Sequence, residues 1–158
     1  LTDEQKSFCQ GIGKEFIKLL ENTNMTKVYK MPVLMTFYNH GDVRMEVTET
    51  ELLASWKEFF STGTNWKDLD TGITYEQYCK ISDKDHIKRI IKMPVNFLVK
   101  SGKGFFLKRE DSALALRDEM KEIIKNPVLA QQMKDVIEYR AMDYYQRRYK
   151  EQMTALLQ

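Results

Sequence analysis

Along most of this chain, hydrophobic residues recur every three or four positions among polar ones, which is the spacing of amphipathic helices. Residues 3–21 place apolar side chains three or four positions apart, at Phe8, Ile12, Phe16 and Leu19 or Leu20, which is the period of one helix face. Further helices are predicted at 32–39, 48–61, 75–80, 82–100 and from about 128 to the end. The pattern therefore predicts a mainly α-helical protein.

A second pattern, with period two, predicts a few short strands. The stretch VRMEV at 43–47 alternates apolar and polar residues. After the turn sequence SGKG at 101–104 come the runs FFLK and ALAL, which the segment REDS at 109–112 joins. We expect these two runs to form a β-hairpin.

Local signals mark where the helices begin. Thr48 and Glu51 have the spacing of a capping box, in which each side chain bonds to the other residue's backbone N–H. The three prolines, Pro32, Pro94 and Pro127, are each followed by valine, and KMPV occurs twice. The flanking segments match at no fixed period, so we interpret these prolines as points where a helix starts or kinks.

The predicted order from residue 32 is helix, strand, helix, helix and a terminal hairpin, which is the order of a winged helix. A helix-turn-helix connection needs only about 3–4 residues, whereas roughly 20 separate the predicted helices 48–61 and 82–100. Either the fold is an elaborated variant or the order is a coincidence. We predict a mainly α protein with a small β-hairpin: an N-terminal helix (1–24), a winged-helix-like domain (25–118) and a C-terminal helical extension (119–158).

Charge is distributed unevenly over the 158 residues, whose formal net charge is +2. Residues 80–109 hold nine basic and two acidic residues, a local net charge of +7. Such a concentration favours contact with a polyanion, although a solvated basic face without a partner gives the same composition. No apolar run approaches the roughly 20 residues that cross a bilayer, and two cysteines without a secretory signal indicate reduced thiols and a cytoplasmic protein.

The helix predicted at 82–100 carries the strongest candidate for a binding surface. Lysines recur every fourth residue and so form one stripe opposite the apolar face. Lysine suits phosphate contacts, whereas arginine and asparagine can make bidentate contacts with bases. The candidate nucleic-acid-binding residues are Lys84, Lys88, Arg89, Lys92, Asn96, Lys100, Lys103, Lys108 and Arg109.

The last helix combines tyrosine with arginine, side chains that are frequent at interface hot spots. Candidate partner-binding residues are Tyr139, Arg140, Tyr144, Arg147 and Arg148. The alternative, which we favour for most of them, is that the rings pack this helix on its own domain while the arginines pair with nearby acids.

Catalytic signatures are missing from the sequence. It has no phosphate-binding glycine loop, nucleophile elbow or Cys/His metal spacing, and His40 and His86 are expected to be surface or capping residues. Asp111, Glu119 and Lys121 only faintly match a nuclease pattern. We expect no enzyme activity from this chain on its own, no metal or other cofactor and no small-molecule substrate.

Four stretches carry a family resemblance: FYNHGDVRMEVT (37–48), SWKEFFSTGTNWKDL (55–69), KMPVNFLVKSGKGFF (92–106) and VIEYRAMDYYQRRY (136–149). They resemble the C-terminal region of large bacterial superfamily II helicases and restriction-type ATPases, over about residues 25–150. The resemblance implies an accessory module behind an ATP-driven motor that lies outside this chain. It carries over no ATP-binding or catalytic residue, since no helicase motif is present.

Together these patterns predict a non-catalytic accessory domain that positions DNA or RNA by phosphate contacts. Because the chain begins at Leu1, we expect it to be cut from a larger protein, whose remainder would be a second partner. The alternatives are a protein-docking domain without nucleic-acid contact and a self-standing transcription regulator, which would need a dimer with two recognition helices one DNA turn apart.

Overall fold

The computed structural model describes residues 11–25, 27–38 and 42–157. The helices are α2 (Ile12–Asn22), α3 (Lys30–Tyr38), α4 (Glu49–Ser61), α5 (Tyr75–Cys79), α6 (Asp83–Ile90), α7 (Asn96–Ser101), α8 (Met120–Ile123) and α9 (Pro127–Leu157), with a 3-10 turn η1 (Asn65–Asp68) and a π-helical turn η2 (Ile91–Val95). The strands are β1 (Glu46–Val47), β2 (Phe106–Arg109) and β3 (Ser112–Leu116). This content confirms the predicted fold class, mainly α with a small β-hairpin.

The three strands form one antiparallel sheet in the order β1-β3-β2. Phe106 pairs with Leu116 and Val47 pairs with Leu114, and all four side chains are buried. β1 is shorter than the predicted strand at 43–47, because the Arg44 amide donates to the Phe37 carbonyl of α3 at 2.8 Å instead of to the sheet. From α3 to β3 the order is helix, strand, helix, the short elements η1 and α5, the continuous α6–η2–α7 helix and two strands. The predicted order is therefore present, with η1 and α5 inserted before α6.

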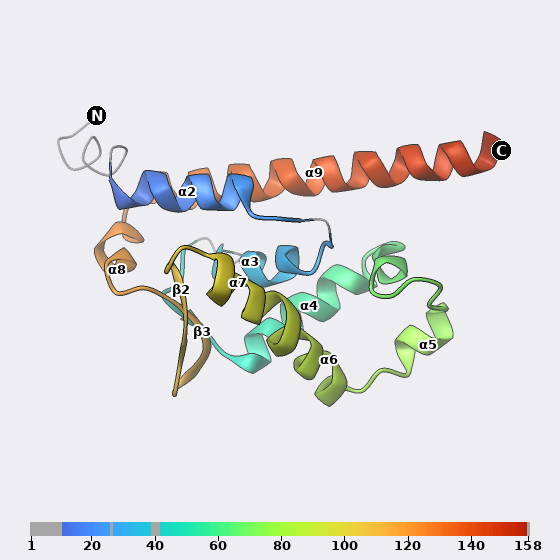
Figure 1. The fold of residues 1–158 in the computed structure, drawn as a ribbon, viewed down its shortest axis with the longest axis horizontal. Coiled ribbons are helices and arrows are strands. Elements are labelled where there is room, and N and C mark those ends of the chain that lie inside the picture. The colour runs from blue at the N-terminus through green and yellow to red at the C-terminus, as the bar shows by residue number, and fades with distance from the viewer. Residues whose placement is uncertain (1–10, 26, 39–41, 158) are drawn as a thin grey trace.

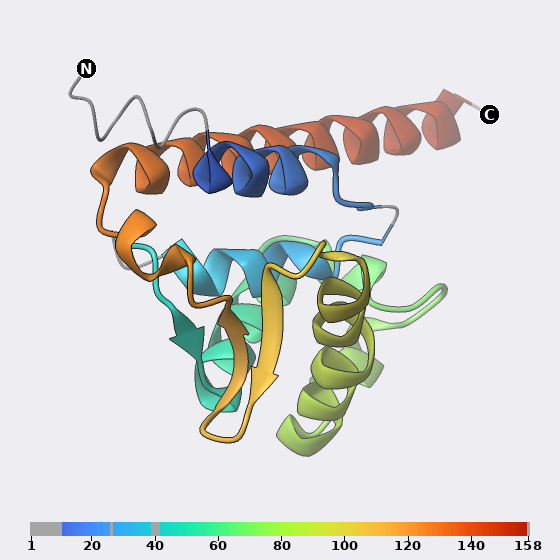
Figure 2. The same cartoon turned by 60° about the vertical axis from the view of Figure 1, so that its left-hand side comes forward.

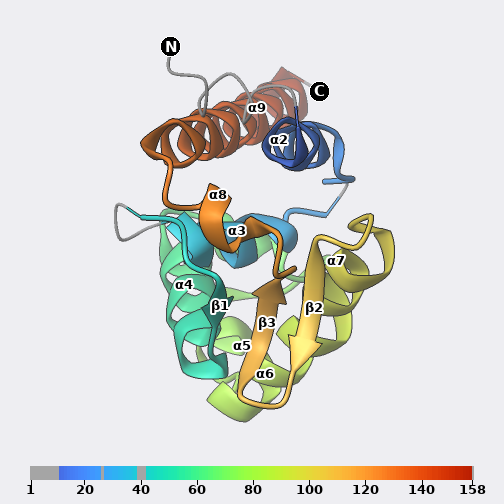
Figure 3. The same ribbon diagram turned by 90° about the vertical axis from the view of Figure 1, so that its left-hand side faces the viewer.

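The elements form two layers (Figure 1). Helices α2 and α9 lie side by side in one layer, and α3 lies between them and the layer that contains α4, α6, α7 and the sheet (Figures 1 and 3). An aromatic cluster joins the layers: the Phe16 ring centroid lies 5.4 Å from that of Phe105, and Phe37 lies 5.8 Å from Phe106. The start of the hairpin is therefore packed against α2 and α3 through Phe105 and Phe106.

Helix ends follow the local signals. The backbone N–H of Glu51 donates to Thr48 Oγ1 at 3.1 Å and the Thr48 N–H donates to Glu51 Oε1 at 3.1 Å, which confirms the predicted capping box. Pro127 begins α9, and Pro32 lies in the first turn of α3. Pro94 lies within the π-helical turn η2. The prolines thus mark helix starts and one irregular turn, as the sequence indicated.

The long connection between α4 and α6 is folded against the core. Its Leu69 side chain is fully buried, and the Leu69 carbonyl accepts hydrogen bonds from the Tyr29 hydroxyl and, at 3.1 Å, from Arg89 Nη1. A second capping box, Thr74 with Gln77, begins α5. This connection therefore inserts an ordered segment where a shorter helix-turn-helix unit would have a tight turn.

His86 is buried, so its predicted surface position was wrong. Its side chain is 2% exposed, and its Nδ1 accepts a hydrogen bond from Trp56 Nε1 at 3.1 Å. The Tyr78 ring packs edge-on against the imidazole. The expectations for Phe8, Cys9 and His40 fall on residues outside the described ranges, while Cys79 is a free, exposed thiol.

Candidate nucleic-acid interface

The basic surface is built on a helix that continues from Asp83 to Ser101 through α6, η2 and α7. It begins at Ser82, whose Oγ accepts from the Asp85 backbone N–H at 3.1 Å. Its inner side carries His86, Ile90, Val95 and Leu98, which are all buried. The lysine stripe lies on the opposite, exposed side.

The π-helical turn keeps this stripe on one side of the helix. Four residues overshoot one turn of an α-helix by about 40° because a turn takes 3.6 residues. A π turn takes one more residue, since its hydrogen bonds run from i to i+5, and so it offsets that drift between Lys92 and Asn96. Pro94 explains why the π-helical turn occurs at this point, because proline has no N–H for the ordinary helical hydrogen bond. Where the sequence predicted a kink at Pro94, the structure has a wider, π-helical turn of the helix.

Six lysines of this region remain without an acidic partner. Each is exposed, and among the described residues none of their ammonium groups lies within 4.0 Å of a carboxylate: Lys84, Lys88, Lys92, Lys100, Lys103 and Lys108. Elsewhere in the described chain, exposed Lys57, Lys80, Lys125 and Lys134 pair with acids, whereas exposed Lys14, Lys18, Lys27, Lys67, Lys121 and Lys150 also have no acidic partner within 4.0 Å. The stripe and hairpin differ from the rest of the chain because six of these unpaired lysines lie on one helix and on the turn and hairpin that follow it.

The turn between α7 and β2 sets the hairpin beside the helix. A Cβ on Gly102 would overlap the Leu98 carbonyl oxygen, so only glycine fits there. Lys103 follows with φ 52° and Gly104 with φ 82°, and the left-handed conformation is unfavourable for a lysine. In Figure 2, β2 runs alongside α6–α7, and the hairpin tip lies at the same end as the start of α6, far from α2 and α9. The hairpin thus lies beside the helix that carries the stripe.

The two arginines expected to read bases are instead engaged within the protein. Arg89 is half-buried, and its Nη1 lies 2.8 Å from Asp70 Oδ2 in the α4–α6 connection. Arg109 Nη2 lies 2.6 Å from Asp118 Oδ1. Asn96 is half-buried, and its side-chain amide has no hydrogen-bond partner among the described residues. Of the three residues suited to bidentate base contacts, Asn96 alone has a side chain without a polar partner among the described residues.

The acids of this region lie at the start of α6 and at the hairpin tip, where Glu110 and Asp111 are exposed between β2 and β3. Asp83 Oδ1 accepts from Lys57 Nζ at 2.8 Å, and this hydrogen bond lowers the pKa of Asp83 below its usual value. Asp85 is exposed in the same first turn, where a negative charge is favourable to the helix dipole. The rest of the stripe is free of acidic neighbours on its own helix.

A second candidate surface lies on α9, and part of it packs inward. Tyr144 donates to the carboxylate of Asp68, and burial is the main cause of its raised pKa. Arg148 Nη1 donates to Asn65 Oδ1 at 2.7 Å, while Arg140 Nη1 donates to the Leu20 carbonyl at 2.9 Å. Tyr144 therefore packs on its own domain, as the alternative predicted for the rings. Arg140 and Arg148 also bond within the domain, but to oxygens of distant segments and not to the nearby acids that the alternative predicted.

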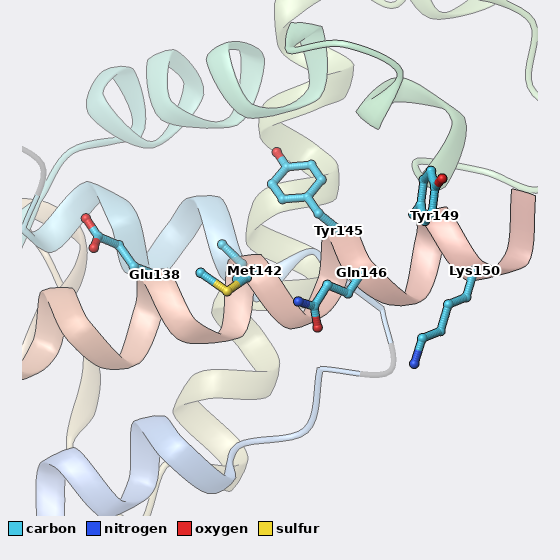
Figure 4. Close-up of a pocket in the computed structure, with 7 residues that line it drawn as sticks. Glu138, Met142, Tyr145, Gln146, Tyr149 and Lys150 are labelled. Carbon is cyan, nitrogen blue, oxygen red and sulfur yellow. The ribbon is translucent and has the colours of Figure 1, made fainter. Parts of the chain in front are cut away.

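The other side of α9 is exposed and apolar. Figure 4 shows Met142, Tyr145 and Tyr149 along one open pocket, with Glu138 and Lys150 at its ends. Met142 is 59% exposed and Tyr149 is 64% exposed. Of the other predicted residues, Tyr139 is exposed and Arg147 pairs with Asp143 at 3.3 Å.

Two sites important to the fold were missed by sequence reasoning. Lys30 is 6% exposed and donates to Thr23 Oγ1 at 3.0 Å, and burial lowers its pKa. Arg148 reaches Thr64 and Asn65 in the α4–α6 connection. Neither has a sequence signal, because the partners lie on other elements, and KMPV at 30–33 looks like KMPV at 92–95, where the lysine is exposed.

No family model, curated protein or solved structure matches this chain. Within the described residues there is no cluster of three or more His, Cys, Asp or Glu side chains that could hold a metal ion. In the same part of the chain, no helix has the length and apolar character needed to span a membrane. The candidate site therefore rests on its own geometry and charge.

Proposed function

We propose that this chain is a winged-helix accessory domain that binds nucleic acid through α6–α7 and the β2–β3 hairpin. One observation carries the proposal: six exposed lysines on this helix and the adjoining hairpin have no acidic partner among the described residues. Unpaired positive charge on one helix and on the hairpin beside it is what a phosphate backbone neutralises. The α3–β1–α4–α6–β2–β3 order supports the winged-helix assignment.

The mechanism is positioning by phosphate contacts. Lysine ammonium groups bind phosphate as point charges and carry little sequence information. Since Arg89 and Arg109 are held by Asp70 and Asp118, base reading is limited and the affinity depends on the backbone. The domain thus holds a duplex or a displaced strand, and the chemistry takes place elsewhere.

The setting of the proposal is a larger bacterial, cytoplasmic protein of the ATP-dependent helicase or restriction type. The resemblance in 37–48, 55–69, 92–106 and 136–149 supports this setting. There the remainder of the parent polypeptide would supply ATP hydrolysis, and this domain would have no cofactor and no catalytic residue of its own.

Anisotropy titration of labelled duplex and single-stranded DNA tests the proposal, with the wild type and the double variant Lys88→Glu/Lys92→Glu. We expect binding by the wild type at low salt and a large loss in the variant, because two phosphate contacts become repulsive. The matched control is Lys14→Glu/Lys18→Glu, which makes the same charge change at the same spacing on exposed positions of α2, in the other layer.

The result that opposes the proposal is an equal loss in both double variants, which would indicate a response to net charge alone. Failure of the wild type to bind at low salt would also reject it.

A second candidate function is docking of a protein partner on α9. The exposure of Met142 and Tyr149 along an open pocket favours it, since large apolar side chains on one exposed helix face are typical of interaction sites. Salt distinguishes the two functions: nucleic-acid affinity falls steeply with log[salt], whereas an aromatic interface responds weakly.

A further inference from the structure

An exposed phenyl ring stands out on the basic helix. Phe97 of α7 is 46% exposed. Among the described residues, the other exposed aromatic side chains are tyrosines, whose hydroxyl groups suit contact with water. Phe97 makes no ring-to-ring or cation contact within the described ranges. A planar apolar face is therefore open to a ligand.

The surroundings of this ring are cationic. Lys100 follows Phe97 by three positions, and residues three apart on a helix have Cβ atoms only about 5–6 Å apart. Asn96 precedes Phe97 directly, and Lys92 lies one further turn toward the start of the helix. Leu107 on the neighbouring strand β2 is also exposed, at 37%. The ligand that fits this region must offer negative charge and a flat apolar surface together.

An unpaired nucleotide has both features. Its phosphate is anionic and its base exposes a π-face, whereas a base within a duplex is covered by its stacked neighbours. Aromatic side chains in basic grooves bind single strands by stacking on such bases. We propose that Phe97 stacks on an unpaired base of a nucleic-acid strand whose adjoining phosphates contact Lys92 and Lys100. This inference rests on the proposed function and narrows its ligand to single strands or opened duplex ends.

The test compares two labelled oligonucleotides of equal length, a thymidine strand and an abasic strand that keeps every phosphate. Anisotropy titrations would use the full chain, as wild type, Phe97→Ala, Phe97→Tyr and Tyr75→Ala. The Tyr75 variant is the matched control, since Tyr75 is exposed on α5, outside the lysine stripe. We expect the wild type to prefer the thymidine strand and Phe97→Ala to lose roughly five- to hundredfold in affinity for it.

The abasic strand decides whether the ring contacts a base. Phe97→Ala should bind it as the wild type does, and Phe97→Tyr should restore the preference for thymidine, because a tyrosine ring stacks equally well. Equal losses on both strands, no loss on either, or the same loss in Tyr75→Ala would overturn the proposal. The proposal would also be overturned if Phe97→Ala lost affinity for anionic phosphatidylserine vesicles but not for either oligonucleotide, because the ring would then be a membrane contact.

The two proposals fail in different ways. If the wild type binds both strands in a salt-sensitive manner without preference for bases, the stacking proposal fails and the phosphate-binding function remains. If the wild type binds neither strand at low salt, the stacking proposal is rejected. The proposed function is rejected as well only if the labelled duplex also fails to bind at low salt.

Discussion

The indole Nε1 of Trp56 donates a hydrogen bond of 3.1 Å to Nδ1 of His86, and both side chains are buried. This bond joins α4 to the start of the lysine-bearing helix, thirty positions further along the chain. The imidazole can accept it only while Nδ1 is unprotonated. The position of the basic helix is therefore linked to the protonation state of one histidine.

This link predicts that stability falls at mildly acidic pH. Burial, the largest cause, lowers the pKa of His86 below its ordinary value of 6.5. Because the unfolded chain then binds a proton that the folded chain does not, the stabilisation is complete above pH 6.5 and decreases as the pH falls toward the lower pKa of the folded state. Urea unfolding between pH 7.5 and 5.5 measures this dependence.

The matched variant is His86→Gln, whose amide oxygen can still accept from Trp56 but does not titrate. We expect a smaller decrease of unfolding free energy over the same pH range. An unchanged decrease would show that His86 is not its source.

Arg148 is expected to make the main polar contact between the C-terminal half of α9 and the α4–α6 connection. Its guanidinium donates to Asn65 Oδ1 at 2.7 Å and to Thr64 Oγ1 at 2.6 Å, and Asn65 is 1% exposed. Arg148→Ala leaves the buried Asn65 oxygen without this partner, so we predict a loss of about 1–3 kcal/mol in unfolding free energy. Urea denaturation measures the loss.

The control for this prediction is Arg147→Ala, at the preceding position of α9. Arg147 is exposed and pairs only with Asp143, at 3.3 Å, a type of contact that contributes about 0.3–0.5 kcal/mol. Similar losses in the two variants would contradict the assigned role of Arg148.

Gly102 should be required for the hairpin to lie beside α7. A Cβ there would overlap the Leu98 carbonyl oxygen, and such overpacking typically costs about 1–3 kcal/mol. Gly63→Ala is the comparison, because Gly63 has φ 53° and open space around it, so that substitution adds backbone strain without overlap. Thermal unfolding should show the larger loss for Gly102→Ala, and the reverse order would refute the packing argument.

Most helices could be predicted because their signals are local. The capping box at Thr48 and Glu51 and the helix start at Pro127 depend on residues within one turn. The length of β1 and the small helix α8 could not be predicted. The strand begins late because the Arg44 amide donates to the Phe37 carbonyl, and α8 has only four residues.

The candidate site was predicted only in part, for a physical reason. Exposure of the lysines follows from their spacing opposite an apolar face, which the sequence displays. The pairing of Arg89 with Asp70 depends instead on how the α4–α6 connection folds back against the helix, and no local pattern encodes that. The contact between Arg148 and Asn65 spans 83 positions and was hidden for the same reason.

The most direct test of the central claim is the salt dependence of duplex-DNA binding by the wild-type chain. If all six unpaired lysines contact phosphates, log K should fall linearly with log[salt], with a slope approaching about −5. Each single substitution to Ala at Lys88, Lys92 or Lys100 should reduce that slope by about 1. An affinity that does not change between about 50 and 200 mM salt, or no binding of either duplex or single-stranded DNA at the lower value, would contradict the account.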